Sequence, residues 1–287
     1  MGKIREKVGE IIFLLSAVMS VFLILLIIFF IFSEGVKFVN EYGLLKFVTG
    51  KVWKPTAGNP RFGIYPMIIG SLIVTSLSTL IALPFGLAIS IFMAYYAKKS
   101  YKGLKALMNL MAAIPSVVYG FFAMMVLVPL VKDIFHVKSG MNMLTASILL
   151  AFMILPTMVN ISENSLRQVP KTFMTGSLAL GATKEETIRK ILVPYARSGI
   201  FSSIILAIGR AIGETMAVYL VIGNQPVMPS SILKGARTLT TNIVLEMGYA
   251  SGTHRQALIA TGMVLFVFIL IINIGFNIIR SKTEERL

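Results

Sequence analysis

Six stretches of the chain are long and apolar enough to cross a lipid bilayer. A hydrocarbon core about 30 Å thick needs roughly 20 apolar residues of helix, at about 1.5 Å per residue. The candidate spans cover residues 11–33, 65–96, 106–131, 142–162, 199–222 and 257–279. Only 14% of the residues are charged and the mean hydropathy is +0.83, which is far above what a soluble domain of this length needs. The predicted fold class is therefore an all-α integral membrane protein with six transmembrane helices.

The first span and two later ones carry further signals. Residues 11–33 hold no charge and no small-x-small cleavage site follows them, so we interpret this segment as a retained span and not as a signal peptide. Pro84 and Pro115 lie inside the second and third spans, where each removes a backbone hydrogen-bond donor. Lipid cannot replace that donor, but neighbouring helices or a cavity can. Breaks are therefore expected at both prolines.

Basic residues are unevenly distributed over the segments between the spans. With the N-terminus inside, the inner segments hold 16 Lys or Arg in 63 residues and the outer segments hold 10 in 75. Because basic residues stay on the cytoplasmic side, both termini are expected in the cytoplasm. The net charge of +15 then reflects contact with anionic membrane lipid, and nucleic acid is not expected as a partner.

The outer segments offer contact surface but little chemistry. Segments 34–64 and 223–256 are long enough to meet an extracytoplasmic partner, or they are solvated connectors. His136 and His254 stand singly in outer segments and no cysteine occurs, so no metal site or cofactor is expected. Phosphate-loop, H-E-x-x-H and G-x-S-x-G motifs are absent from the sequence. The chain is therefore not expected to be an enzyme or to hydrolyse ATP itself.

The inner segment 163–198 has the signals of two helices joined by a glycine turn. Pro170 stands at a plausible first helical position, and Gly181 provides a flexible stop. Thr183 and Glu186 form a T-x-x-E capping box at the start of the second helix. The segment is therefore predicted to be a helical hairpin.

The second helix of this hairpin, KEETIRKILV, is expected to end at Pro194. Ile188, Ile191 and Leu192 form an apolar stripe at i, i+3 and i+4. Such a stripe favours docking into a groove of a soluble partner. The alternative is that the hairpin lies on the membrane surface or packs beneath its own bundle.

Two charges interrupt the fifth span, within GRAIGETMAV. If the span starts near Gly199, Arg210 lies roughly 16 Å along the helix axis, close to the bilayer midplane. An Arg at that depth costs about 2.5–3.5 kcal/mol, so it should face the bundle interior or a wet cavity. The i, i+4 spacing puts Glu214 on the same face and within reach of Arg210. The pair indicates a substrate pathway, or a salt bridge that only ties the span to its neighbours.

Small residues accompany these charges. Gly209 and Gly213 form a G-x-x-x-G pattern, which lets another backbone approach closely. We therefore expect close helix packing beside the polar edge of the span.

A guanidinium inside the membrane favours an anionic cargo. Its planar fork matches a tetrahedral oxyanion with two parallel hydrogen bonds. Near neutral pH phosphate still carries protons to donate, whereas sulfate has none. A carboxylate acceptor at Glu214 would therefore favour phosphate over sulfate.

The inner segment resembles the cytoplasmic signature of ABC-importer permeases, E-A-A-x3-G-x9-I-x-L-P. In TGSLALGATKEETIRKILVP, Gly181, Ile191 and Pro194 are in register, while Thr-Gly-Ser replaces Glu-Ala-Ala. The resemblance implies a type I permease core, MetI-like in fold, that couples to a separate ATPase through this loop. The residues implied in the coupling are Thr175, Gly176, Ser177, Gly181, Ala182, Thr183, Glu186, Ile191 and Pro194.

More specifically, residues 60–280 resemble the permease subunits of Pst-type phosphate importers. The matching blocks are FGIYPMIIGSLIVT, IPSVVYGFF, MILPTMVNISENSLRQVP, SLALGAT and GRAIGETMAVYLVIGN. RAIGETMAV is the most specific of them, and in that family its Arg and Glu are associated with phosphate passage. The resemblance therefore implies the same role for Arg210 and Glu214.

The resemblance also implies an assembly in a prokaryotic cytoplasmic membrane. A PstA-like second permease subunit would form a heterodimer with this chain, two PstB-like ATP-binding subunits would bind below, and a PstS-like phosphate-binding protein would deliver cargo outside. The permease core is expected at 65–280, after a first helix and outer loop at 1–64 and before a cytoplasmic tail at 281–287. Two alternatives stay open: a permease for another oxyanion such as sulfate, molybdate or a phosphonate, and a membrane scaffold or sensor that transports nothing.

Overall fold

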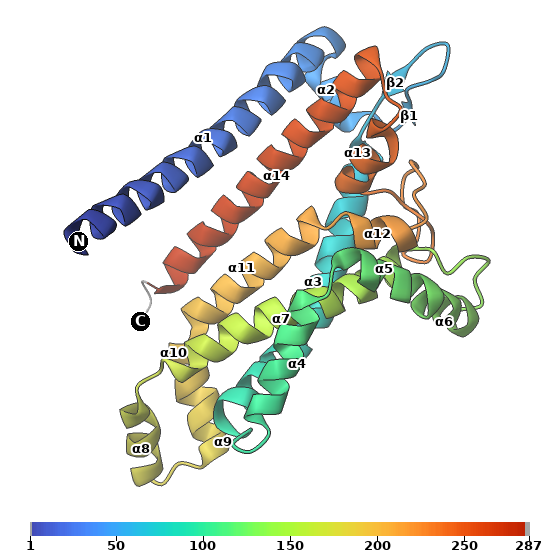
Figure 1. Ribbon diagram of the computed structural model, residues 1–287. Helices are drawn as coiled ribbons and strands as arrows, with labels where there is room; N and C mark the ends of the chain where they lie inside the picture. The colour runs from blue at the N-terminus through green and yellow to red at the C-terminus, as the bar shows by residue number, and fades with distance from the viewer. Residues whose placement is uncertain (1, 285–287) are drawn as a thin grey trace.

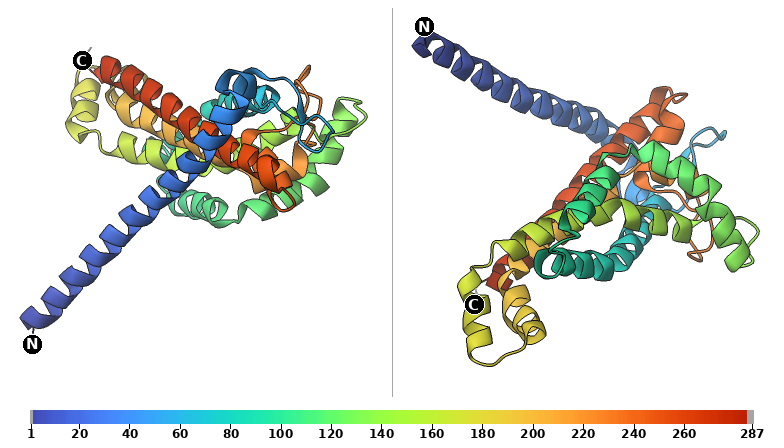
Figure 2. Two further views of the ribbon diagram at one scale, coloured as in Figure 1. Left: turned by 90° about the horizontal axis from the view of Figure 1, so that it is seen from above. Right: turned by 60° about the horizontal axis from the view of Figure 1, so that its bottom comes forward.

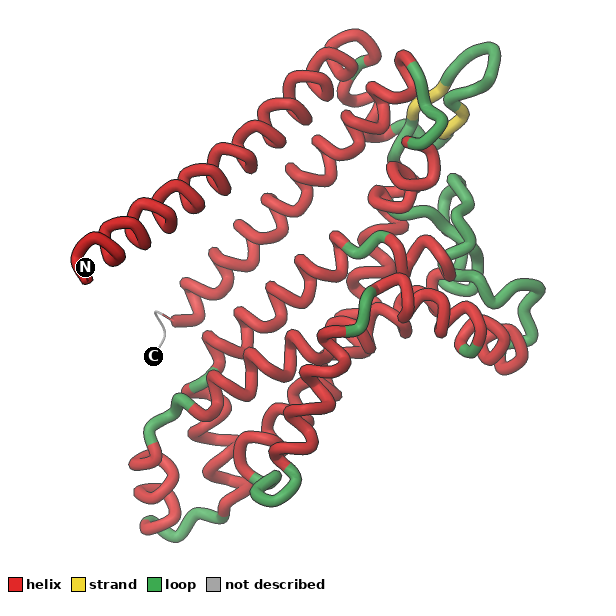
Figure 3. Tube along the Cα trace, viewed as in Figure 1, coloured by secondary structure: helices red, strands yellow, loops and turns green. Residues whose placement is uncertain are grey.

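The chain folds into helices of very different lengths and one two-stranded ribbon (Figure 1, Figure 3). The computed structural model describes the backbone of residues 2–284 and the side chains of residues 6–278. In chain order the elements are α1 (Gly2–Tyr42), α2 (Leu44–Thr49), β1 (Trp53–Lys54), β2 (Arg61–Phe62), α3 (Tyr65–Tyr95), α4 (Tyr101–Ala113), α5 (Ser116–Met125), α6 (Leu127–Ile134), α7 (Met143–Arg167), α8 (Lys171–Ala179), α9 (Lys184–Thr187), the π-helical turn η1 (Ile188–Leu192), α10 (Val193–Tyr195), α11 (Arg197–Gly213), α12 (Met216–Val221), α13 (Leu239–Met247) and α14 (Gly252–Glu284).

Among the described residues, five helices are long and apolar enough to cross a membrane. They are Glu6–Tyr42, Tyr65–Tyr95, Ser116–Ile134, Met143–Arg167 and Gly252–Ile278. A sixth span results if Lys184–Tyr195 and Arg197–Gly213, which meet at a 67° bend, are counted together. The predicted fold class is confirmed, but two spans differ from the expected ones: the third is divided into α4, α5 and α6, and the fifth ends at Gly213 and is followed by the short helix α12.

The helices α3 and α7 form the central pair of the bundle. A Cβ atom on Gly86 of α3 would lie 2.6 Å from the sulfur of Met158 on α7, so glycine permits this close approach. One apolar cluster joins the pair to α5 and α12, and a second joins it to α11. The elements that carry the candidate site are therefore held against one rigid pair.

The C-terminal part of the first span, α1, lies against α14, and the rest of α1 projects from the bundle (Figure 2). Gly35 lets the two helices approach, because a Cβ atom there would lie 2.9 Å from the sulfur of Met263. Apolar side chains between Val8 and Phe30 are exposed around most of the helix. A helix that is apolar on all sides belongs in lipid or against another membrane protein.

The two prolines behave differently. The break at Pro115 is confirmed, because α4 ends at Ala113 and Ile114 is extended. The prediction of a break at Pro84 is wrong, because α3 continues through this residue. Ala82 and Gly86, on either side of Pro84, are buried, and Ala82 belongs to the cluster that joins α3 to α7. Packing on both sides of the proline keeps the helix continuous.

The segment 223–256, which is expected to lie outside, has regular structure of its own. It contains the helix α13, whose first turn is capped by Thr238 and Thr241 in a reciprocal hydrogen-bond pair. Such capping satisfies backbone donors that an uncapped first turn leaves without partners. The segment also holds His254, which the sequence places alone but which lies at the start of α14 in a polar network.

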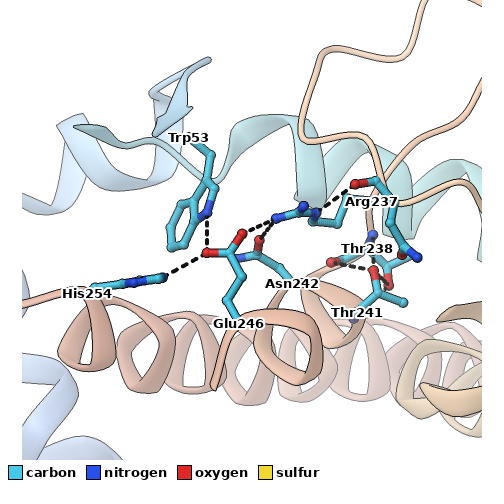
Figure 4. A network of polar contacts seen from close by, with 8 residues as sticks. Trp53, Arg237, Thr238, Thr241, Asn242, Glu246 and His254 are labelled. Atoms are coloured by element: carbon cyan, nitrogen blue, oxygen red, sulfur yellow. Dashed lines mark hydrogen bonds and ion pairs between the residues drawn. The ribbon is translucent and has the colours of Figure 1, made fainter. Parts of the chain in front are cut away.

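That polar network centres on the buried carboxylate of Glu246 (Figure 4). One oxygen accepts from Trp53 Nε1 at 2.9 Å and lies 2.8 Å from His254 Nε2. The other accepts from Arg237 Nη1, which also donates to Asn242 Oδ1 at 2.8 Å. The network, which we call the outer lock, joins the ribbon, α13, α14 and the loop before α13. The described residues contain no group of three potential metal ligands.

The two ends of the bundle are distinct. The chain termini and the α8–α9 hairpin lie toward one end, whereas the β1–β2 ribbon and α13 lie toward the other (Figure 1). The helix α14 continues through residues 281–284 of the predicted tail, and residues 285–287 lie outside the described residues.

Glu246→Ala is expected to lower the free energy of unfolding by about 3–5 kcal/mol, because it leaves the buried Arg237 guanidinium without its carboxylate. At about 2–4 °C per kcal/mol this is a fall of roughly 10 °C in the melting temperature in detergent. Glu41→Ala removes an exposed carboxylate and serves as the control. Equal melting temperatures for the two variants would contradict the importance of the outer lock.

Candidate functional site

Arg210 lies in the last turn of α11. The helix α11 itself lies between the hairpin and the ribbon (Figure 1). Its side chain is exposed, and Nη1 donates to Thr157 Oγ1 on α7 at 3.0 Å. Among the described residues this is its one hydrogen bond, and it makes no ion pair. Most of the guanidinium donors are therefore available.

The predicted pairing of Arg210 with Glu214 is wrong, because the helix does not continue between them. The helix α11 ends at Gly213, and Glu214 is extended, with φ −68° and ψ 129°. Glu214 Oε1 instead accepts from the backbone N–H groups of Thr215 at 3.1 Å and Ala217 at 3.4 Å, at the start of α12. The carboxylate therefore caps α12, where the helix dipole favours negative charge.

The remaining polar groups of this break also find partners. Thr215 Oγ1 donates to the Gly213 carbonyl at 3.1 Å, and Thr240 Oγ1 of α13 donates to the Glu214 carbonyl at 3.1 Å. Carbonyls at a helix C-terminus have no partner within the helix. Side chains from two elements thus stabilise a helix break inside the bundle.

At the break before α5, next to Pro115, a side chain also satisfies a free carbonyl, and this break packs against the break between α11 and α12. Tyr119 Oη donates to the carbonyl of Met111, in the last turn of α4, at 2.9 Å. A Cβ atom on Gly120 of α5 would lie 2.9 Å from the Cα of Ala217 on α12. The short helices that follow the two breaks therefore lie in direct backbone contact.

The face beside Arg210 is open. The predicted close packing at Gly209 and Gly213 is wrong within this chain, because a Cβ atom at either position would meet nothing within 4 Å. On α7, one turn from Thr157, the buried Oδ1 of Asn160 has no hydrogen-bond partner among the described residues. The site is thus an exposed guanidinium held by one hydroxyl of α7.

The predicted hairpin is confirmed. Gly181 has φ +87°, a left-handed conformation that suits glycine, and it separates α8 from α9. The N–H of Glu186 donates to Thr183 Oγ1, and the N–H of Thr183 donates to Glu186 Oε2, both at 3.2 Å. Hydrogen bonds from the Thr183 backbone and from Lys190 hold the pKa of the exposed Glu186 carboxyl below its usual range.

The expected helix end at Pro194 is wrong. The chain passes through the π-helical turn η1, in which the Val193 N–H donates to the Ile188 carbonyl, and then through α10. In a π-helical turn each N–H pairs with the carbonyl five residues earlier in place of four. This shift in pairing accommodates Pro194, which has no N–H to donate. The bend follows at Ala196, where α11 begins.

The apolar stripe of the hairpin faces its own bundle. Ile188 and Leu192 are buried in a cluster with Leu166, and Ile191 packs against that cluster. The alternative interpretation of the stripe therefore holds. The outward side of the hairpin instead exposes Phe173, Leu178, Leu180 and Tyr195, with Leu180 91% exposed at the turn.

All nine residues of the predicted coupling loop lie in this hairpin or directly after it. Ser177 is buried, and its hydroxyl lies 2.8 Å from that of Thr187, so it joins α8 to α9. Thr175 and Gly176 are exposed. Of the three residues that replace Glu-Ala-Ala, Ser177 is therefore buried in the hairpin, and Thr175 and Gly176 lie on its surface.

One buried carboxylate near the hairpin was not singled out from the sequence. Glu163 on α7 is fully buried and accepts from Lys105 Nζ at 2.9 Å, from Tyr101 Oη at 3.2 Å and from Arg167. These contacts fix α4 to α7. The sequence signal for Glu163 is a charge directly after the predicted fourth span. The corresponding signal for Thr157, the partner of Arg210, is a hydroxyl that follows Pro156 in the middle of the same span.

Comparisons with known proteins agree with this architecture. Residues 86–285 match the family described as binding-protein-dependent transport system inner membrane component. The probable ABC transporter permease protein YqgH of Bacillus subtilis is 42% identical over 241 residues, covering 82% of this chain and 78% of the relative. The probable phosphate transport system permease protein PstC of Methanocaldococcus jannaschii is 34% identical over 297 residues, covering 95% and 93%.

Solved structures show the same fold at low sequence identity. The MetNI methionine ABC transporter in an inward-facing conformation matches with a TM-score of 0.62 and 19% identity, over 77% of this chain and 95% of that one. A bacterial alginate ABC transporter, solved with a pentasaccharide-bound periplasmic protein, matches with a TM-score of 0.62 and 17% identity, over 92% and 93%.

The separation of Arg210 from Glu214 is tested by a double-mutant cycle. Arg210→Ala and Glu214→Ala are expected to change the free energy of unfolding additively, within about 0.5 kcal/mol, because the two side chains do not touch. Thr183→Ala and Glu186→Ala form the control cycle, and since these residues contact each other their effects should not add. A coupling above about 1 kcal/mol between Arg210 and Glu214 would contradict the broken helix.

Proposed function

Because this chain belongs to the family of binding-protein-dependent transport system inner membrane components and is a permease subunit of an ABC importer, we propose that its cargo is inorganic phosphate. The observation that carries the proposal is the exposed guanidinium of Arg210 inside a membrane bundle, with a single hydroxyl as its partner. A guanidinium fork binds a tetrahedral oxyanion through parallel hydrogen bonds. Phosphate permeases named PstC among the relatives support the same cargo.

Two side chains would act with Arg210 on a bound anion. Thr157 orients the guanidinium through Oγ1 and leaves the other donors for cargo. Glu214 uses Oε1 to cap α12, whereas its second oxygen makes no hydrogen bond among the described residues. That oxygen is available to accept a hydrogen bond from the O–H of hydrogen phosphate, which sulfate cannot donate.

The assembly follows from the surfaces that the chain leaves open. A second permease subunit would cover the face with Gly209 and Gly213, closing the pathway around Arg210. Two ATP-binding subunits would contact the hairpin around exposed Leu180 and drive alternating access. In this arrangement the hairpin and both termini would lie in the cytoplasm, and the density of basic residues in the segments at that end supports this orientation. A phosphate-binding protein would dock at the opposite end.

Arg210→Ala is expected to reduce ATP-dependent phosphate uptake by about tenfold to a hundredfold, because a charge-assisted contact worth about 1.5–3 kcal/mol is lost. Arg210→Lys should keep part of the activity, since it retains charge without the fork. Uptake is measured in liposomes with all partner subunits present, and Arg255→Ala at the exposed start of α14 is the control. Unchanged uptake in normally assembled Arg210→Ala would overturn the assignment of Arg210, and no phosphate uptake in the wild type would overturn the cargo.

Glu214→Gln tests how the pathway distinguishes oxyanions. The amide can still cap α12 through its carbonyl oxygen but offers no second acceptor oxygen to a phosphate O–H, because its other group is an NH2 donor. We expect the preference for phosphate over sulfate, measured by competition in the same uptake assay, to fall severalfold while assembly is kept. Molybdate and a phosphonate serve as further competitors. An unchanged preference would exclude Glu214 from selectivity, and wild-type transport of sulfate or molybdate ahead of phosphate would favour the alternative cargo.

A further inference from the structure

The β1–β2 ribbon and the loop before α13 enclose a basic groove at the end of the molecule opposite the hairpin. The groove has a volume of about 580 Å³. It is lined on the ribbon side by Lys51, Trp53, Lys54 and Arg61 and on the other side by Pro226 and Met228. The three cations are exposed, and none of the residues that line the groove is acidic. Within the described part of the chain, none of the three makes an ion pair.

Two of these cations are placed where folding alone disfavours them. The antiparallel register pairs Lys54 directly with Arg61, and Trp53 with Phe62. Like charges in directly opposite positions of a strand pair destabilise it. The ribbon is held by its other face, where Trp53 and Phe62 are buried in an aromatic cluster. The outward face therefore carries a repulsion that a bound anionic group would relieve.

The two walls of the groove are fixed to each other by the outer lock (Figure 4). Trp53, from the ribbon wall, donates to Glu246, and Arg237 donates both to Glu246 and, through Nε, to the Asn224 carbonyl at 3.1 Å. Asn224 lies two residues before Pro226 in the other wall. Buried side chains thus hold an exposed cationic surface in one shape, which lowers the ordering cost of binding a partner.

We propose that this groove, with Lys51, Lys54 and Arg61, is the docking site for an acidic surface segment of the soluble solute-binding protein. The inference rests on the proposed function for the partner, because the family takes its cargo from a binding protein. The occupant is inferred from charge complementarity and from the position of the groove at the end away from the termini and the hairpin. Complementary charge mainly speeds encounter and fixes orientation.

The test measures binding of the purified, phosphate-loaded binding protein to the complete importer in nanodiscs of phosphatidylcholine. The combined substitution Lys51→Glu, Lys54→Glu, Arg61→Glu is expected to lower the association rate at low salt by about tenfold or more and to flatten its salt dependence. ATP hydrolysis in the absence of binding protein should be unchanged. Lys98→Glu, Lys99→Glu, Lys102→Glu, on the connection between α3 and α4 and in the first turn of α4, makes the same change of charge at the other end and should leave association unaffected.

The single substitution Arg61→Glu separates docking from folding. It replaces a repulsive cross-strand pair by an attractive one, so the melting temperature should stay equal or rise while association slows severalfold. A purely structural role for these residues would predict that stability and binding change together. The triple substitution to Gln serves as a second variant in case charge reversal disturbs assembly, and it should also slow association.

Three results would overturn the inference. One is wild-type association in a normally assembled triple variant. Another is an effect seen only when phosphatidylglycerol is added to the nanodiscs, which would assign the groove to anionic lipid headgroups. The last is an equal effect of the Lys98, Lys99, Lys102 control. Failure of the proposed cargo is distinguishable, because a wild-type importer that binds the protein but takes up no phosphate would leave the groove assignment standing.

Discussion

Every backbone polar group that a membrane chain buries must find its partner within protein, because the hydrocarbon core supplies no water. Continuous helices without an internal proline meet this condition along their length, as α1 and α14 do, whereas α3 and α7 continue through Pro84 and Pro156. The chain nevertheless interrupts its helices within the bundle, and two of these breaks lie before α5 and before α12. At one break Tyr119 takes a carbonyl of α4, and at the other Glu214, Thr215 and Thr240 take the donors and acceptors that the break leaves free.

These breaks place the candidate site. A continuous fifth helix would have put Arg210 and Glu214 on one face and allowed them to neutralise each other. Ending α11 at Gly213 instead commits the carboxylate to the start of α12 and leaves the guanidinium with Thr157 alone. An unneutralised cation is what an anion pathway requires. The helix break thus keeps Arg210 unpaired, whereas a continuous helix would let Glu214 neutralise it.

The features predicted from the sequence are those set by local patterns. Apolar length identified the spans, Pro115 identified a break, and the Thr183–Glu186 box and Gly181 identified the hairpin. The break at Glu214 has no proline and depends on Thr240, which lies 26 positions further along the chain. The outer lock joins Trp53 to Glu246 across 193 positions, so no local pattern could reveal it. Pro84 failed as a signal for the opposite reason, because packing against α7 outweighs its local effect.

The same geometry relates the two ends of the molecule. The helix α11 begins at the 67° bend after the hairpin and ends three residues beyond Arg210. A displacement of the hairpin therefore acts on the guanidinium through a single helix of 17 residues. On the other side of the break, α12 is joined through Thr240 to α13, which carries Glu246 and hence the outer lock. Arg210 thus stands three residues before the junction between α11, which begins at the hairpin, and the short helix α12, whose start is tied to α13 and through it to the outer lock.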